Sequence, residues 1–119
     1  MYKRQTLDPA QSNSEKQLVR RFAMLQELGR LLEQNMLTFD AANELAEDMS
    51  LDLASRRNSG EISNDAFLEA GVIQGGISVL ANMVATGVNH SEIMVHFNQI
   101  RDRAATICKN FPELTVVLA

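Results

Sequence analysis

The feature that most constrains this chain is a long stretch without charge, because no Asp, Glu, Lys or Arg occurs between Glu69 and Glu92. A helix that is apolar on nearly every face is usually surrounded either by protein or by lipid. Lipid is the poorer choice here, since the stretch lacks Lys or Arg flanks and holds four polar residues, Gln74, Ser78, Asn82 and Thr86. We therefore expect residues 70–88 to form the central buried helix of a small helical domain, with no membrane contact.

The composition favours helix-on-helix packing within one domain. Of the 119 residues, 45% are hydrophobic and 22% charged, which is typical of a globular protein, and only 5% are aromatic. The net charge of −4 argues against nucleic acid and anionic membranes as partners. Cys108 is the single cysteine, so an intramolecular disulfide is excluded. With no hydrophobic signal segment at the start of the sequence, these features predict a cytoplasmic protein.

The first predicted helix follows a capping-box pattern at Ser12 and Glu15 and continues to about Asn35. Its apolar or small residues recur every three or four positions, at Leu18, Phe22, Leu25, Gly29, Leu32 and Met36. A glycine within a helix costs about 1 kcal/mol relative to alanine. Gly29 on the apolar side therefore predicts a close approach of this backbone to a neighbour.

The second and third helices are bounded by recognisable signals. Thr38 is a good N-cap for the second helix, and the Asn-Ser-Gly sequence at 58–60 predicts its end. Ser63 or Asn64 caps the third helix, which contains the uncharged stretch and ends at Gly87. Its small residues lie one turn apart on one side, a spacing that lets a partner helix come close, at Gly71, Gly75 and Gly76.

The fourth helix begins with Asn89 and ends at Pro112. It carries the strictest heptad of the chain, formed by Ile93, Phe97, Ile100, Ala104, Ile107 and Phe111. Residues 114–119 are apolar and β-prone, and we expect them to fold back over the bundle or to pack on another subunit. The predicted fold is all-α: an up-down four-helix bundle over residues 14–111 with a short apolar tail at 112–119. We expect residues 1–13 to form a flexible lead-in.

The first five residues, MYKRQ, resemble the translation of a common transposase-derived sequencing adapter read from a GTG start. We expect them to be an adapter scar, with the native start elsewhere. A genuine basic N-terminus is the alternative.

The candidate catalytic groups are weak. Glu44, Glu47 and Asp48 resemble the E-x-x-E half of the all-α nucleotide pyrophosphohydrolase pattern, which implies metal-dependent nucleotide hydrolysis, but the second half, E-x-x-D on a later helix, is absent. A solvated acidic face is the better interpretation. Glu92 and His96 share a helix face, yet the ligand set that a metal requires is missing. Cys108 adjoins an apolar stripe, which favours an inert packing thiol over a nucleophile. We expect neither a cofactor nor a metal.

Three functions remain open. Two are non-catalytic, and the third, a carboxylate metal-dependent nucleotide hydrolase built on Glu44 and Glu47, is the second alternative. The leading hypothesis is a small interaction protein that forms a homodimer and binds or blocks a partner protein, by analogy with proteins of phages and other mobile elements. Its predicted interface consists of Gly71, Gly75, Val79, Phe97, Ile100, Leu114, Val116 and Leu118. The alternative is a bundle that sequesters a small phosphorylated ligand or nucleotide, with Gln74, Asn82 and Arg101 as ligand-binding residues. Further anion candidates are the arginines at positions 20, 21, 30, 56, 57 and 103.

Overall fold

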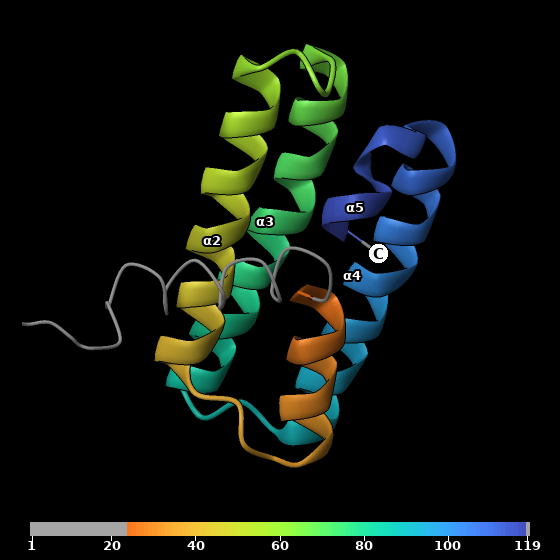
Figure 1. Cartoon of the computed structure of the whole chain (residues 1–119). Coiled ribbons are helices and arrows are strands. Elements are labelled where there is room, and N and C mark those ends of the chain that lie inside the picture. The colour runs from red at the N-terminus through yellow and green to blue at the C-terminus, as the bar shows by residue number, and fades with distance from the viewer. Residues whose placement is uncertain (1–23, 119) are drawn as a thin grey trace, which may run out of the picture.

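A computed structural model describes residues 24–118, and all regular elements in this range are helices (Figure 1). A first helical segment covers residues 24–33. It is followed by α2 (Phe39–Asn58), α3 (Asn64–Ala85), α4 (His90–Asn110), the 3-10 helix η1 (Pro112–Leu114) and α5 (Thr115–Leu118). The first segment, α2, α3 and α4 alternate in direction, so the predicted all-α up-down bundle is confirmed. The predictions for residues 1–23, including the adapter scar, the lead-in and the start of the first helix, lie outside the described residues.

Side-chain caps define the starts of the three long helices. Thr38, Ser63 and Asn89 each occupy the N-cap position of α2, α3 and α4, respectively. The side-chain oxygens of these residues accept hydrogen bonds from first-turn amides at 3.1, 3.0 and 2.8 Å. Such amides have no partner within the helix, so these caps fix where the helices begin. Of the two caps that the sequence allows for α3, the structure contains Ser63.

Left-handed backbone positions end the helices. Gly60 follows α2 with φ of +82°, and Gly87 follows α3 with φ of +75°. This region is accessible to glycine without steric cost, so both glycines act as stop signals, as the sequence predicts.

One continuous apolar core joins the described elements. It contains residues from every helical segment, and no polar side chain among residues 24–118 is fully buried. The predicted α4 heptad lies in this core at five positions: Ile93, Phe97, Ile100, Ala104 and Ile107. Burying a large aliphatic or aromatic side chain contributes roughly 1.5–3 kcal/mol, so this seam supplies much of the packing energy that holds α4.

Two glycines bring α4 close to its neighbours. A Cβ atom at Gly29 would lie 3.0 Å from Cζ of Phe97, and one at Gly76 would lie 3.0 Å from Cγ1 of Ile100. The close approach predicted from Gly29 is therefore confirmed, and the neighbour is α4.

The apolar tail folds back on its own chain. Its β propensity is overridden, because residues 112–118 form η1 and α5 instead of a strand. Leu114, Val117 and Leu118 are at most 1% exposed and contact the core, while Val116 is 38% exposed. A short helix satisfies its own backbone groups, whereas a lone strand has no partner within the described part of the chain.

Candidate functional site: the outer face of α3 and a groove beside α4

The uncharged helix α3 is covered on one side only, which corrects the expectation that it is surrounded by protein. Its buried side chains form one stripe, Ala66, Ala70, Ile73, Ile77, Leu80 and Ala81. Only 28% of its most apolar 18-residue window is buried. Among the described residues, α3 is the one helix long and apolar enough to cross a membrane. A large part of the uncharged surface of α3 therefore faces outward.

The outward-facing residues form a second stripe, which we call the outer α3 face: Leu68, Gly71, Val72, Gly75, Val79 and Asn82. At 3.6 residues per turn these positions fall on one side of the helix, over a length of about 21 Å. Leu68, Val72 and Val79 are 61%, 43% and 49% exposed. The face is thus both apolar and open to solvent.

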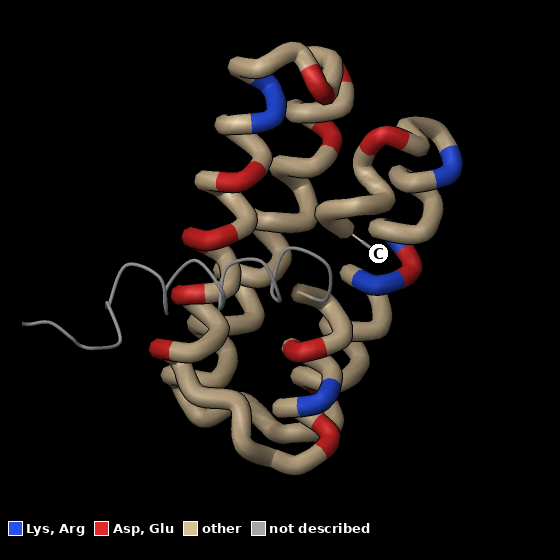
Figure 2. Tube along the Cα trace, viewed as in Figure 1, with Lys and Arg blue, Asp and Glu red and all other residues tan. Residues whose placement is uncertain are grey.

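Charge is absent from this face. Figure 2 shows acidic residues along α2, whereas α3 carries charge only near its start, at Asp65 and Glu69. A Cβ atom at Gly71 or Gly75 would meet nothing within 4 Å, so the space above the helix backbone is free of other described atoms. A second helix can therefore approach this face closely.

The structure divides the predicted interface residues into two groups. Gly71, Gly75 and Val79 lie on the outer α3 face, and Val116 is partly exposed on α5. The other four belong to the core of their own chain and are 5% exposed or less: Phe97, Ile100, Leu114 and Leu118. Phe97 packs against the first helical segment and Ile100 against α3, and Leu114 and Leu118 belong to the same core.

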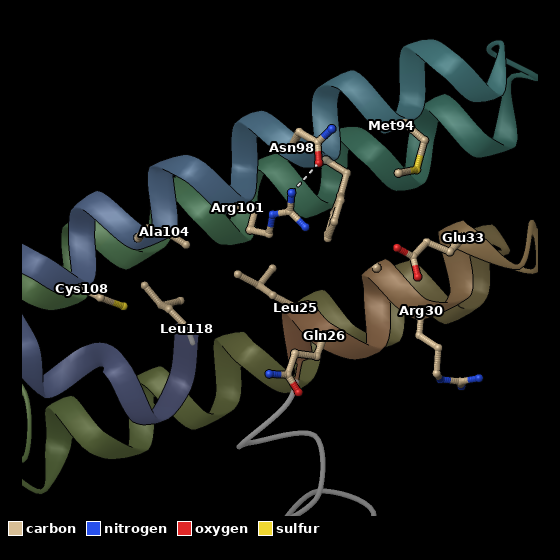
Figure 3. A pocket seen from close by; sticks show the side chains of 13 residues that line it. Leu25, Gln26, Arg30, Glu33, Met94, Asn98, Arg101, Ala104, Cys108 and Leu118 are labelled. Atoms are coloured by element: carbon tan, nitrogen blue, oxygen red, sulfur yellow. Dashed lines mark hydrogen bonds between the residues drawn. The ribbon is translucent and has the colours of Figure 1, made fainter.

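A groove of about 540 Å³ lies between the first helical segment and α4, beside Leu118 of α5 (Figure 3). Its apolar end contains Leu25, Ala104, Cys108 and Leu118, and its polar lining includes Arg101. The sequence analysis did not predict this groove. The one feature of the sequence that indicates it is the pair of small residues Ala104 and Ala105, since small side chains beside a helix-packing seam leave space.

Among the candidate anion-binding arginines in residues 24–118, Arg30, Arg56 and Arg57 have intramolecular partners. Arg56 pairs with Asp52 at 3.2 Å and with Glu61. The guanidinium of Arg57 lies 4.1 Å from the centroid of the Phe67 ring. These contacts place both arginines at the α2–α3 turn, where they stabilise the hairpin.

Arg30 also has partners, and it lies on the groove. It pairs with Glu27 at 2.9 Å and donates to Gln34 at 3.2 Å. The hydrogen bond and the charge of Glu27 raise the pKa of Arg30 above its ordinary value. Figure 3 shows its guanidinium directed away from the groove.

Arg101 differs from the others. It donates to Asn98 Oδ1 at 3.0 Å, and its guanidinium carbon lies 5.5 Å from the centroid of the Phe97 ring. No described carboxylate forms an ion pair with it. The groove lining contains neither Gln74 nor Asn82, so the three predicted ligand-binding residues do not form one site. Arg103 is exposed, and Arg20 and Arg21 lie outside the described residues.

The carboxylate and histidine candidates are dispersed. Residues 24–118 contain no cluster of three or more His, Cys, Asp or Glu side chains that could hold a metal ion. Glu44 and Glu47 lie on the exposed side of α2, where Glu47 accepts a hydrogen bond from Asn43. His96 contacts the carbonyl of Gly76 through Nε2 at 3.1 Å and thereby joins α4 to α3.

Cys108 is a half-buried thiol on the groove. Burial raises the pKa of Cys108, and this effect exceeds the opposing effect of a hydrogen bond with Thr115. A raised pKa keeps the sulfur protonated near neutral pH, and a protonated thiol is a poor nucleophile. The Cys108 site therefore favours packing over covalent catalysis.

Comparison of the chain with protein-family models, with curated proteins and with solved structures finds no match.

Proposed function

We propose that this protein is a non-enzymatic helical interaction module that forms a symmetric homodimer through the outer α3 face. The observation that carries the proposal is the open, uncharged stripe on a helix whose opposite side is packed in the core. Burying three aliphatic side chains that are each about half exposed contributes on the order of 1 kcal/mol per side chain.

A second copy is the occupant that suits this face. A charged partner surface would lose hydration against the stripe without gaining an ion pair. Two identical stripes related by a two-fold axis avoid this cost, and bulky side chains such as Val72 and Val79 can then lie above the glycines of the other copy. The chain as a whole is acidic, with a net charge of −4, so the uncharged face is also where two copies repel each other least.

The dimer is expected to be reversible. A stripe of about 21 Å on one helix buries less than the roughly 800 Å² per partner of a standard stable interface. We therefore expect dissociation on dilution through the micromolar range. A module of this kind can exchange its own second copy for a partner protein that offers a similar apolar face.

Light scattering after size exclusion, over a dilution series, tests the proposal. Val79→Asp places a charge on the outer α3 face and should give a monomer at every concentration. Leu51→Asp is the matched control, because Leu51 is 65% exposed on α2, outside the stripe, and should leave the dimer intact. A wild-type monomer at all concentrations would refute the proposal. So would flotation of the chain with neutral lipid vesicles in place of dimerisation, which would assign the face to a membrane.

A further inference from the structure

The groove beside α4 has the size of a small-molecule site. Its volume of about 540 Å³ falls within the 300–1,000 Å³ typical of ligand pockets. Its lining includes no residue of α3, so it is separate from the outer α3 face and from the proposed dimer. The lining residues give the groove an apolar end and a polar middle, which indicates a ligand with two chemically different ends.

Arg101 supplies the polar anchor. Its guanidinium points from α4 toward the first helical segment in Figure 3, and it is positioned by Asn98 and the Phe97 ring. A guanidinium has five N–H donors in a planar fork that matches a carboxylate or phosphate group. The contact with Asn98 leaves several of these donors for a ligand.

Glu33 restricts where a negative group can lie. It lines the same groove and has no ion-pair partner among the described residues. In Figure 3 it lies with Arg30 on the first helical segment, toward Met94, away from the end marked by Cys108 and Leu118. Its carboxylate repels an anion, so the charged head of a ligand belongs at Arg101 and its remainder toward the opposite end.

That opposite end suits an alkyl chain. Leu25, Ala104 and Leu118 are all buried apolar residues that border the space, and no charged side chain of the lining lies between them in Figure 3. The Cys108 thiol completes this end, and burial raises its pKa, which favours the neutral form. An alkyl chain therefore meets apolar or uncharged atoms throughout.

We propose that this groove binds a small amphipathic anion, with a carboxylate or phosphate head on Arg101 and an apolar tail between Leu25, Ala104 and Leu118. The head-group chemistry is shared by fatty acids and by alkyl phosphates, which the experiment distinguishes.

Cys108 provides the measurement, since it is the single cysteine and lines the apolar end. The rate of its alkylation by iodoacetamide is followed in the full chain with increasing decanoate, decyl phosphate or decanol. We expect decanoate or decyl phosphate to slow alkylation in a saturable manner, and the stronger of the two identifies the head group. Decanol, which has the same tail without a charge, should require a roughly tenfold higher concentration or more, because a hydrogen bond to a charged group is lost.

Variants test the assigned positions. Arg101→Gln should raise the half-maximal concentration of the anion roughly tenfold, and Arg101→Lys should restore part of the binding, because the charge returns without the fork. Arg103→Gln is the matched control, since Arg103 is exposed on α4 and absent from the lining, and should change nothing. Glu33→Gln should tighten binding. Far-ultraviolet circular dichroism checks that each variant is folded.

Three results would overturn the proposal. The first is protection by decanol at the same concentrations as by decanoate, which would show an apolar groove without a charge requirement. The second is equal protection in the wild type and in Arg101→Gln. The third is a Cys108 that reacts only after unfolding, which would show that the groove is closed to solutes.

Discussion

Helices α3 and α4 both carry long apolar stripes, but the chain uses them differently. α4 contains many charged residues, and its narrow heptad is almost fully covered by the first helical segment and α3. α3 is the more apolar helix, yet much of its surface is open. The position of apolar residues around a helix thus decides what the core covers, whereas their number does not. Apolar residues beyond the core stripe are surplus to folding, and the proposed dimer makes use of this surplus on α3.

The largest expected effect is the difference in the free energy of unfolding between a substitution in the α4 seam and one on the outer α3 face. Phe97→Ala should destabilise the chain by about 3–5 kcal/mol, because it leaves a cavity in the α4 seam. Val79→Ala on the outer α3 face should change the stability of the monomer by less than about 0.5 kcal/mol. Urea unfolding at low protein concentration measures both. A cost for Val79→Ala comparable to that for Phe97→Ala would show that the outer α3 face is part of the core.

Replacing a glycine by alanine should have an intermediate effect on stability, with opposite signs at Gly29, beside the α4 seam, and at Gly75, on the outer α3 face. Gly29→Ala should destabilise by about 1–3 kcal/mol, less the gain in helix propensity, since the new Cβ meets the buried Phe97 ring. Gly75→Ala meets nothing within 4 Å and should stabilise the monomer by up to about 1 kcal/mol. Thermal unfolding of both variants at the same dilute concentration measures the difference. Stabilisation of both would mean that Gly29 is not a packing contact.

The smallest effect concerns the pH dependence of alkylation at Cys108, which lies on α4. Its raised pKa means that less thiolate is present in the folded than in the unfolded chain at a given pH. Alkylation of the folded chain should therefore begin at higher pH than alkylation in urea. By linkage, this group favours the folded state below its ordinary pKa, and stability falls as pH rises from there through the folded pKa. Identical pH profiles with and without urea would contradict this assignment.

The sequence contained most of the fold because helix ends are local. Thr38, Asn89 and Gly60 act through neighbouring backbone groups, and the α4 heptad has a clear period. The open side of α3 could not be found in the same way. Val79 is exposed and Leu80 is buried, although both are aliphatic residues of the uncharged stretch. When both sides of a helix are apolar, periodicity no longer identifies the side that is covered.

The groove and its anchor depended on tertiary structure. Arg56, Arg57 and Arg101 are equivalent candidates in the sequence, and only their neighbours distinguish them. Arg56 and Arg57 contact the α2–α3 turn, while Arg101 faces the groove. Gln74 and Asn82 share a helix with each other but not a cavity with Arg101. A side-chain pattern along one helix does not contain the distance to the next helix, so this site could not be assembled from sequence alone.

The contacts at the α2–α3 turn have a consequence for the order of folding. Asp52, Arg56 and Glu61 form a chain of ion pairs, and Arg57 lies over Phe67. All of these partners are near in sequence, so closing this hairpin costs little chain entropy. Contacts of this kind form early, whereas the packing of α4 on the first helical segment, as at Gly29 and Phe97, joins residues much further apart in the chain. We therefore expect α2 and α3 to form the nucleus on which α4 later docks. In this order of folding, α3 is already paired with α2 before its outer face meets another molecule.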